Sequence, residues 1–335
     1  MFYTRRDFGK LALAALPAAS PLAAVLESAR QPAKPDSRFA GVHIGINAPY
    51  SFRGLPGGPE DILNYCRQLG VSALELRSQP VEAFLGVPAH LVGARGGGRR
   101  GGGAGQGVGE RGRGRAALTP EEQAAQRARA EELLKWRLGV SMDRVREFRR
   151  KYEEAGVFIE IVKFDGIYAL PDDGIEYSFD LAKALGARAI SCEISVPDTK
   201  RLGQFAEKHQ LLVGYHGHAS TTPADWETAF GYSKYNGANV DLGHFVAGNN
   251  TSPLEFITKY HDRIPHVHVK DRKRNNGANV RFGDGDTPIR DVLAAISKNK
   301  WQIQGTIEYE YPLPDGSDVM TELARCVQFC RNALT

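Results

Sequence analysis

Eight short runs of apolar and β-branched residues recur along the chain, each bounded by turn-forming residues. Runs of roughly four to eight such residues are typical of buried β-strands. The runs occupy residues 41–47, 72–77, 157–164, 189–196, 211–218, 239–242, 265–270 and 304–309. The pattern therefore predicts eight strands spread over most of the sequence.

Longer stretches with an amphipathic helical period lie between these runs. They predict helices at residues 60–69, 142–155, 175–185, 199–209, 254–260, 289–298 and 318–333. Gly70, Gly156 and Gly186 stand at the ends of three of these stretches, as helix stop signals do. Residues 119–140 predict another helix with Thr119 as its N-cap.

Strands that alternate with helices through short connections favour a closed parallel barrel. We therefore predict that residues 39–335 form a (β/α)8 TIM barrel, which is an α/β fold. An open doubly wound sheet is the alternative, and it would normally carry a glycine-rich phosphate turn after its first strand. The turn after the first run reads Asn47-Ala48-Pro49-Tyr50-Ser51 and lacks that pattern.

Residues 1–38 resemble an export signal and a linker. Thr4-Arg5-Arg6-Asp7-Phe8-Gly9-Lys10 resembles the twin-arginine motif, and a short apolar stretch and small residues follow it. The apolar stretch is too short to span a bilayer stably, and a frayed amphipathic helix is the competing interpretation. The segment predicts export by the twin-arginine route to the periplasm, with no stable membrane insertion after processing. The site of cleavage is left open, and an uncleaved anchor stays an alternative.

Composition is ordinary for a globular protein, with 42% hydrophobic and 24% charged residues. The formal charge of +4 has a local origin: residues 93–115 hold six arginines, one glutamate and twelve glycines. This segment lacks an apolar period, so we expect a disordered insert. It is interpreted as a tolerated loop expansion or as a tether for polyanions. Four cysteines are too few for a disulfide scaffold in a chain of 335 residues.

Metal-binding residue types stand at the ends of four successive predicted strands. Residues two apart share a strand face, and the inward residue nearest the strand end is the natural ligand. That rule selects His216, Asp241, His268 and Glu308. Two imidazoles and two carboxylates can hold one divalent ion, such as Mn²⁺, Zn²⁺, Co²⁺ or Fe²⁺, whereas Mg²⁺ prefers more oxygen ligands.

Further polar residues lie near the same strand ends. Glu193 ends the fourth predicted strand and is a fifth ligand, a general base or half of a rim salt bridge. We expect His244 on the loop above the site, where it suits a substrate hydroxyl. Contacts with substrate are also expected from three residues, His218, Lys270 and Glu310. Glu75 and Arg77 end the second predicted strand, where a plain ion pair at the rim is favoured over side chains that face the same mouth as the site.

Four segments make residues 41–333 resemble the xylose isomerase-like barrels of the sugar phosphate isomerase/epimerase family. They are Asp241-Leu242-Gly243-His244, the run His266-Val267-His268-Val269-Lys270-Asp271, Gly283-Asp284-Gly285, and Thr306-Ile307-Glu308-Tyr309-Glu310. In that family the ligands come from strands five to eight as Glu, Asp, His and Glu. This chain departs at strand five, where His216-Gly217-His218 replaces a glutamate-bearing segment.

The resemblance implies a metal-dependent isomerase or epimerase that acts on a keto-sugar or free sugar through a metal-held enediolate. Glu308 and Glu193 are then the expected acid/base pair. A lyase or hydrolase of 3-keto-glycosides is the nearest alternative. An abasic-site endonuclease would need more ligands and a basic face for phosphates, so we expect no nucleic-acid partner. A non-catalytic sugar-binding barrel would keep the fold without the ligands, and a homo-oligomer is compatible with the sequence.

Overall fold

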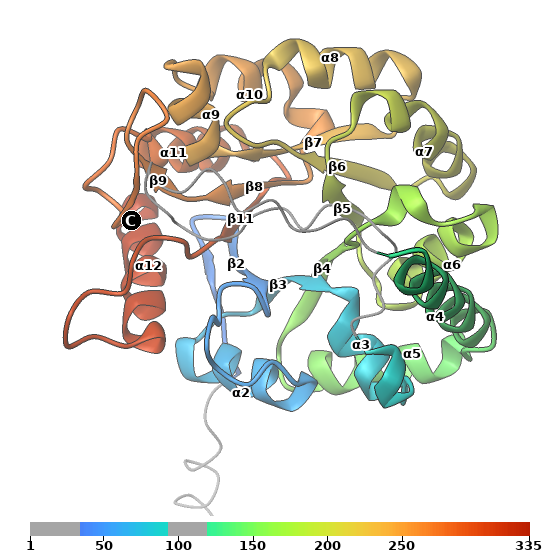
Figure 1. Ribbon diagram of the computed structural model, residues 1–335. Coiled ribbons are helices and arrows are strands. Elements are labelled where there is room, and N and C mark those ends of the chain that lie inside the picture. Colours follow the sequence, from blue (N-terminus) through green and yellow to red (C-terminus); the bar gives the residue numbers. More distant parts are fainter. Residues whose placement is uncertain (1–33, 93–118) are drawn as a thin grey trace, which may run out of the picture. The chain divides into compact units, whose positions relative to one another are not determined.

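Eight parallel strands close into a barrel in the computed structural model, which describes residues 34–92 and 119–335. The strands run in the order β2-β11-β8-β7-β6-β5-β4-β3, and β2 pairs with β3 to complete the ring. Figure 1 shows the strands at the centre and the helices around them. The predicted (β/α)8 barrel is confirmed.

The strand bounds agree closely with the apolar runs. The barrel strands are β2 (Val42–Ala48), β3 (Ala73–Arg77), β4 (Phe158–Lys163), β5 (Ala189–Glu193), β6 (Leu212–His216), β7 (Asn236–Asp241), β8 (His266–Val269) and β11 (Gln304–Ile307). Outside the barrel, β1 (Arg38–Phe39) pairs antiparallel with β2, and β9 (Asp271–Arg272) pairs antiparallel with β10 (Asn279–Val280).

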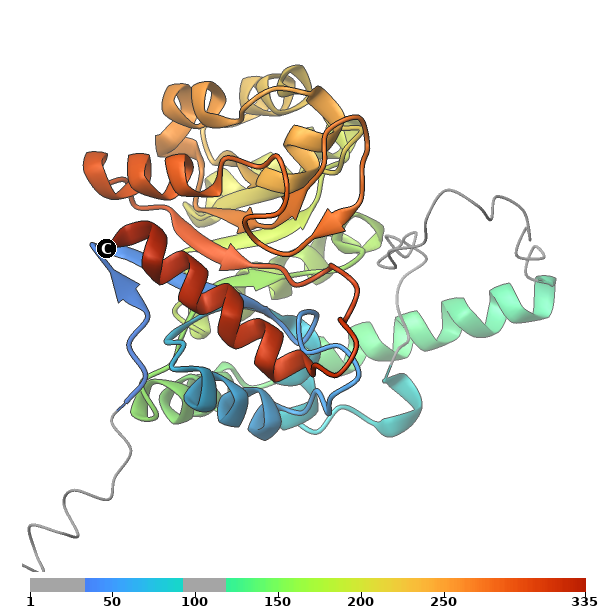
Figure 2. The same cartoon turned by 90° about the vertical axis from the view of Figure 1, so that its left-hand side faces the viewer.

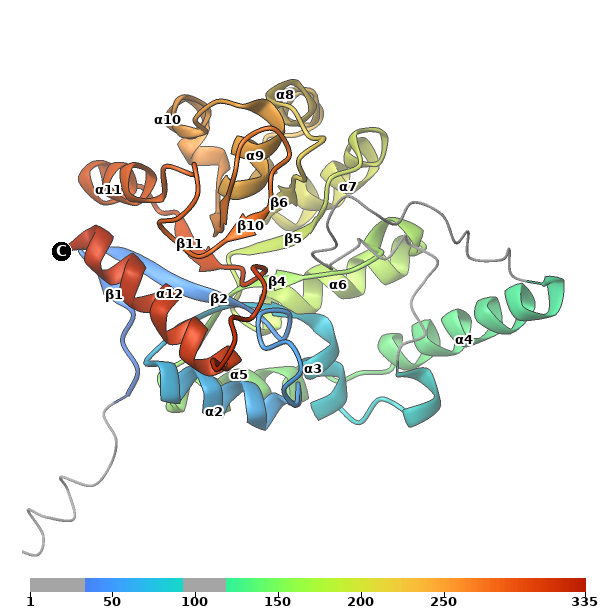
Figure 3. The same ribbon diagram turned by 60° about the vertical axis from the view of Figure 1, so that its left-hand side comes forward.

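The helices follow the strands in chain order. They are α2 (Pro59–Leu69), α3 (Ser78–Phe84), α4 (Pro120–Leu138), α5 (Met142–Glu154), α6 (Asp172–Ala184), α7 (Val196–His209), α8 (Pro223–Tyr232), α9 (Leu242–Asn249), α10 (Leu254–Tyr260), α11 (Ile289–Asn299) and α12 (Val319–Leu334), with short 3₁₀ turns η1 (Ala89–Leu91), η2 (Ile167–Ala169) and η3 (His261–Arg263). The final helix α12 contacts both α11 and α2, so the outer layer closes as the strands do (Figure 3).

Three helices, α3, α8 and α9, were not predicted. Helix α3 is only 7 residues long and begins directly after β3, and α9 contains two glycines that hide its period. Helix α8 starts at a capping box in which Thr222 and Asp225 satisfy each other's backbone N–H groups. That capping box, with Pro223 at the first helical position, is visible in the sequence and would have predicted the start of α8.

Helix α4 confirms the predicted N-cap, because the Thr119 side chain accepts a hydrogen bond from the Glu122 backbone N–H. Leu133 is its one buried residue, and Figure 2 shows α4 extending beyond the ring of strands. The predicted insert at 93–115 and most of the predicted export segment at 1–38 lie outside the described residues. No helix in the described ranges is long and apolar enough to cross a membrane.

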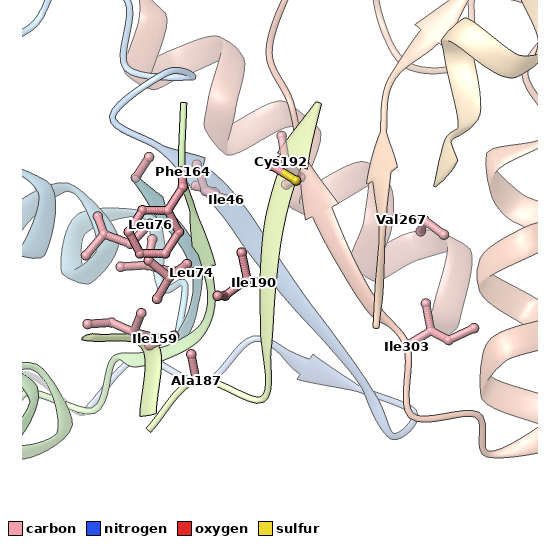
Figure 4. Packing of buried hydrophobic residues seen from close by; sticks show 14 of the residues in the cluster. Ile46, Leu74, Leu76, Ile159, Phe164, Ala187, Ile190, Cys192, Val267 and Ile303 are labelled. Carbon is pink, nitrogen blue, oxygen red and sulfur yellow. The ribbon is translucent and has the colours of Figure 1, made fainter. Parts of the chain in front are cut away.

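The apolar core lies between the barrel and its helices. Alternate strand residues such as Leu74 and Leu76 point outward, and Figure 4 shows them beside Ile159 and Phe164 of the β4 segment. The residues between them point into the barrel, where many are polar. The cysteines are buried and unbridged in this outer layer.

Arg188 ties several segments together at the end of the barrel where the strands begin. Its guanidinium donates to Glu160 at 2.8 Å and to the carbonyl oxygens of Pro265 and Gln302 at 2.6 and 3.0 Å. The other Glu160 oxygen lies 3.3 Å from His43 Nδ1. The hydrogen bond from His43 and the charge of Arg188 lower the Glu160 pKa from 4.5 to about 2, although burial opposes them.

The Glu160 cluster predicts a specific loss of stability in acid. Because the folded-state pKa is depressed, the stabilisation is present above pH 4.5 and is lost as the pH falls toward 2. Glu160→Gln should therefore destabilise the protein by about 1–2 kcal/mol at neutral pH, after allowance for partial solvent screening. The difference from wild type should shrink between pH 5 and pH 2.

Thermal or urea unfolding at several pH values measures this effect. Glu255→Gln is the control, because Glu255 lies exposed in the first turn of α10. A Glu160→Gln variant whose deficit stays constant from pH 7 to about pH 2 would show that this carboxylate does not supply the stabilisation.

Candidate metal centre

Four buried side chains meet where β6, β7, β8 and β11 end. His216 and Asp241 are the last residues of β6 and β7, His268 pairs in register with Asp241, and Glu308 follows β11. Each is at most 4% exposed. One nitrogen or oxygen atom of each lies within 4.8 Å of the corresponding atoms of the others. The structure thus brings together the four residues selected from the sequence, which we call the quartet.

Several quartet atoms lack hydrogen-bond partners. His216 Nδ1 and His268 Nδ1 are buried and make no hydrogen bond, and Asp241 Oδ2 has only its ion pair with Lys270. Buried polar atoms in native proteins almost always have a partner, so atoms left over at one point indicate a missing group. Imidazole nitrogens and carboxylate oxygens are the ligands of Zn²⁺, Mn²⁺ and Co²⁺. The quartet therefore fits a divalent cation.

Lys270 brings a positive charge to the same place. Its ammonium nitrogen lies 2.9 Å from Asp241 Oδ2 and 2.6 Å from both Glu308 Oε2 and Glu310 Oε2. Burial by itself would raise the Asp241 pKa, but Lys270 holds that pKa well below its usual range. One ammonium thus faces three carboxylates, which leaves an excess of negative charge beside the unpartnered atoms.

Asp241 has a second role, because its Oδ1 accepts a hydrogen bond from the His244 backbone N–H at 2.7 Å. This contact caps α9, so the helix starts directly after the strand. His244 therefore lies in the first turn of a helix, and the expectation of a loop there was wrong. Nothing in the apolar pattern of this glycine-containing segment distinguished the two.

His244 lies between two cationic side chains. Its Nδ1 is 2.7 Å from Arg272 Nη1, and its Nε2 is 3.0 Å from Lys270 Nζ. Burial lowers the His244 pKa to about 4, so the ring is neutral near pH 7. A guanidinium and an ammonium both only donate hydrogen bonds, so the neutral ring can accept from only one of these two neighbours, at the nitrogen without a proton, and its other nitrogen keeps an N–H.

Glu193, at the end of β5, is held from both sides. Its Oε1 pairs with Lys163 Nζ at 2.9 Å, and its Oε2 contacts His218 Nε2 at 2.7 Å. Burial alone would raise the Glu193 pKa, but the Lys163 ammonium holds it well below the usual range. The carboxylate is therefore ionised at neutral pH. Its side chain is 39% exposed, and that of His218 is 44% exposed, so both remain accessible.

Glu75 is not part of the expected ion pair with Arg77. It is fully buried inside the barrel, where Oε2 lies 2.5 Å from His268 Nε2 and Oε1 lies 3.4 Å from His266 Nε2. Arg77, at the strand end, pairs with Asp165 instead. The signal was a carboxylate at an inward position between Leu74 and Leu76, and it was readable from the strand period.

Sequence reasoning also gave little weight to three residues near the quartet. Asn47 Nδ2 donates to Glu308 Oε1 at 2.8 Å, and the Tyr50 hydroxyl donates to Glu310. Lys163, at the end of β4, is almost fully buried. Their contacts arise from barrel closure, which places β2 beside β11 and β4 beside β5.

No protein-family model matches the chain. A segment covering 33% of the chain is 28% identical to an inosose dehydratase of Clostridium botulinum (strain Eklund 17B / Type B), and the match spans 44% of that relative. The matched segment therefore spans less than half of that relative's length.

Solved structures share the fold over nearly their full length. A D-psicose 3-epimerase from Clostridium cellulolyticum H10 superposes with a TM-score of 0.56 at 12% identity, covering 88% of this chain and 99% of that chain. A xylose isomerase domain protein from Alicyclobacillus acidocaldarius gives 0.56 at 12% identity, with 87% and 99% covered. A 3-keto-D-glucoside 4-epimerase from E. coli gives 0.53 at 12% identity, with the same coverage. At these identities the likeness establishes the xylose isomerase-like barrel fold.

Asp241→Asn separates the two roles of Asp241. Asparagine caps helices as well as aspartate does, so α9 should remain intact, whereas the lost charge should weaken the binding of Mn²⁺ or Zn²⁺ by about 100-fold or more. Asp241→Ala should lose both the cap, worth about 1 kcal/mol, and the metal. Elemental analysis and chelator competition report the metal, and thermal unfolding reports the cap.

His268→Ala is the companion variant and should also lose the metal while the barrel stays folded. Full metal occupancy in both Asp241→Asn and His268→Ala would exclude the quartet as the binding site.

Proposed function

We propose that this protein is a divalent-metal-dependent isomerase or epimerase of a keto-sugar or free sugar. The observation that carries the proposal is the gathering of the quartet, with the unpartnered Nδ1 atoms of His216 and His268, at the C-terminal end of the barrel. In (β/α)8 enzymes that end holds the active site. Epimerases are among the proteins that share the fold, which supports the same reaction class.

The quartet would hold the ion. A divalent ion bound there would acidify the carbon-bound proton beside a substrate carbonyl by drawing electron density from the carbonyl oxygen. The excess negative charge of Asp241, Glu308 and Glu310 over Lys270 favours such a cation electrostatically.

Glu193 is the proposed base. It is ionised, it is reachable from the mouth, and Lys163 and His218 fix both of its oxygens. It would take the carbon-bound proton and leave an enediolate. Glu308 is the proposed second acid/base. Because its carboxylate is ionised in the free site, it would first take up a proton from water or a substrate hydroxyl and then return it, either to the other face of the same carbon or to the neighbouring carbon. The first outcome is epimerisation, and the second is isomerisation.

Four side chains are suited to hold the substrate. The ring N–H of His244 can donate to a hydroxyl, as can the ammonium of Lys270. His218 stands at the exposed edge of the site, and its ring centroid is 4.9 Å from that of His216. Glu310 can accept from a hydroxyl in place of the tyrosine that now donates to it.

A dehydratase is the second candidate, and the similarity to an inosose dehydratase favours it. Both reactions begin with removal of a proton next to a carbonyl. They differ in the fate of the enediolate, because a dehydratase expels a hydroxyl from the adjacent carbon. Product analysis on a keto-sugar and an inosose distinguishes the two, since only dehydration gives an unsaturated ketone.

Small sugars are the proposed partners, and we propose no nucleic-acid partner. Location outside the cytoplasm, by the twin-arginine route, rests on the amino-terminal segment, which lies mostly outside the described residues. An unphosphorylated substrate agrees with that location, because sugar phosphates are mainly intracellular compounds.

Solvent exchange tests the proposal directly. Purified protein should contain about one divalent ion per chain and should exchange carbon-bound protons of at least one keto-sugar with deuterated water. Absence of both metal and exchange over a panel of keto-sugars would refute the enzymatic function. Metal-free protein that still binds sugars would indicate a sugar-binding barrel instead.

Glu193→Gln should slow exchange by about 10²- to 10⁴-fold, the usual contribution of a general base, while metal content stays at the wild-type level. Glu160→Gln is the control, because that carboxylate lies at the opposite end of the barrel. Undiminished exchange by Glu193→Gln would remove this residue from the catalytic role.

A further inference from the structure

The strongest unassigned feature is a charged cluster buried below the quartet. Glu75, His266 and His268 are all 0% exposed, and they point into the barrel from β3 and β8. An unpaired carboxylate buried at this depth would cost many kcal/mol, so such groups persist where a partner or a role compensates. None of the proposed catalytic steps uses Glu75.

The two nitrogens of the His268 ring face different surroundings. Nε2 lies 2.5 Å from Glu75 Oε2, whereas Nδ1 lies 3.3 Å from Glu308 Oε2 and 3.8 Å from Asp241 Oδ2. Nδ1 makes no hydrogen bond. One edge of the ring is therefore occupied by Glu75, and the other is directed at Asp241 and Glu308, which are the carboxylates of the quartet.

An ionised carboxylate can only accept hydrogen bonds, so the contact with Glu75 requires a proton on Nε2. In a neutral ring the lone pair then belongs to Nδ1, which is the nitrogen that faces Asp241 and Glu308. A histidine ligand normally donates its other ring N–H to a carboxylate or carbonyl, and this contact orients the ring and strengthens the ligand.

Asn239 is the other neighbour of Nε2, at 3.0 Å through Nδ2. Its amide nitrogen and oxygen are nearly interchangeable in shape, so Asn239 adapts to whichever proton the ring carries. Its Oδ1 has no partner, and turning the amide over would place that oxygen beside the Nε2 proton. Glu75 therefore determines which nitrogen of His268 carries the proton, and the Asn239 amide takes the orientation that suits it.

A second metal ion between Glu75 and His268 does not fit. Two ligands of one ion with bonds of about 2.0–2.2 Å lie roughly 3 Å apart or more. The 2.5 Å separation of Glu75 Oε2 and His268 Nε2 is too short for that and suits a charge-assisted hydrogen bond.

A glycine beside the cluster leaves room for the His266 ring. A Cβ on Gly214 of β6 would lie 3.2 Å from His266 Cε1 and 3.0 Å from Pro265 Cγ. Glycine at this inward position therefore accommodates His266 beside Glu75. His266 in turn lies against Oε1 of Glu75 and limits the rotation of the carboxylate.

We propose that Glu75 is a positioning residue that holds His268 with its proton on Nε2 and its Nδ1 lone pair aimed at the metal of the quartet. This inference rests on the proposed metal site. It predicts that Glu75, which would touch neither metal nor substrate, controls metal affinity.

Glu75→Gln should weaken Mn²⁺ or Zn²⁺ binding by about 10- to 100-fold, the usual effect of removing such a partner. Glutamine keeps the size of the side chain but lacks the charge that fixes the proton on Nε2. Glu75→Asp keeps the charge and should recover part of the affinity. Chelator competition measures the dissociation constant, and unfolding curves check that the variants are folded.

Glu322→Gln is the matched control. Glu322 is also a fully buried carboxylate, but it bonds to Arg281, Tyr311 and Ser317 at helix α12. This variant should lose stability without a change in metal affinity. If a folded Glu75→Gln binds metal with wild-type affinity, the inference is wrong. Where glutamine prevents folding, the Nε2 proton of wild-type His268 provides the test instead.

The proton itself gives a readout that needs no metal. In wild type, the Nε2-bound proton of His268 should resonate far downfield in the NMR spectrum and exchange slowly with solvent, and Glu75→Gln should move it upfield. A wild type that binds no metal would refute the proposed function. The inference about Glu75 would then stand or fall on this resonance alone.

Discussion

The burial of negative charge at one end of the barrel is the constraint on which the site depends. Glu75, Asp241 and Glu308 lie almost wholly out of solvent around the His268 ring, and Lys270 is the ammonium that reaches two of them. Burying charges of one sign is expensive unless something of opposite sign is present. The interior therefore combines imidazoles, an ammonium and unpartnered ligand atoms, an arrangement that a divalent cation would complete.

The fold could be predicted in detail because its signal is local. Every barrel strand contains a β-branched or apolar run, and strand alternation alone selects His216, Asp241, His268 and Glu308 from the sequence. Parallel strands in a closed ring bring such strand ends to one place as a matter of geometry. The fifth barrel strand, β6, carries histidine where the resembling family has glutamate, and this difference did not prevent the four side chains from meeting.

The errors have physical causes of a different kind. Helices α3 and α9 are short and begin directly after a strand, so capping and chain connection determine them more than an apolar period does. The partner of Glu75 was missed because it comes from across the barrel, 193 residues later. Hydrogen-bond partners far apart in sequence depend on closure and register, which a single sequence does not display residue by residue.

The segment from His266 to Asp271 combines several tasks within six residues. His268 belongs to the quartet, and Lys270 pairs with the Asp241 carboxylate. The Asp271 carboxylate accepts hydrogen bonds from the backbone N–H groups of Gly283, Gly285 and Thr287. Inserting or deleting one residue here would displace all three functions together, because each depends on the same strand alternation. Evolution of this protein can therefore lengthen the chain elsewhere, as the glycine- and arginine-rich stretch after β3 illustrates, but can vary this segment only by substitution.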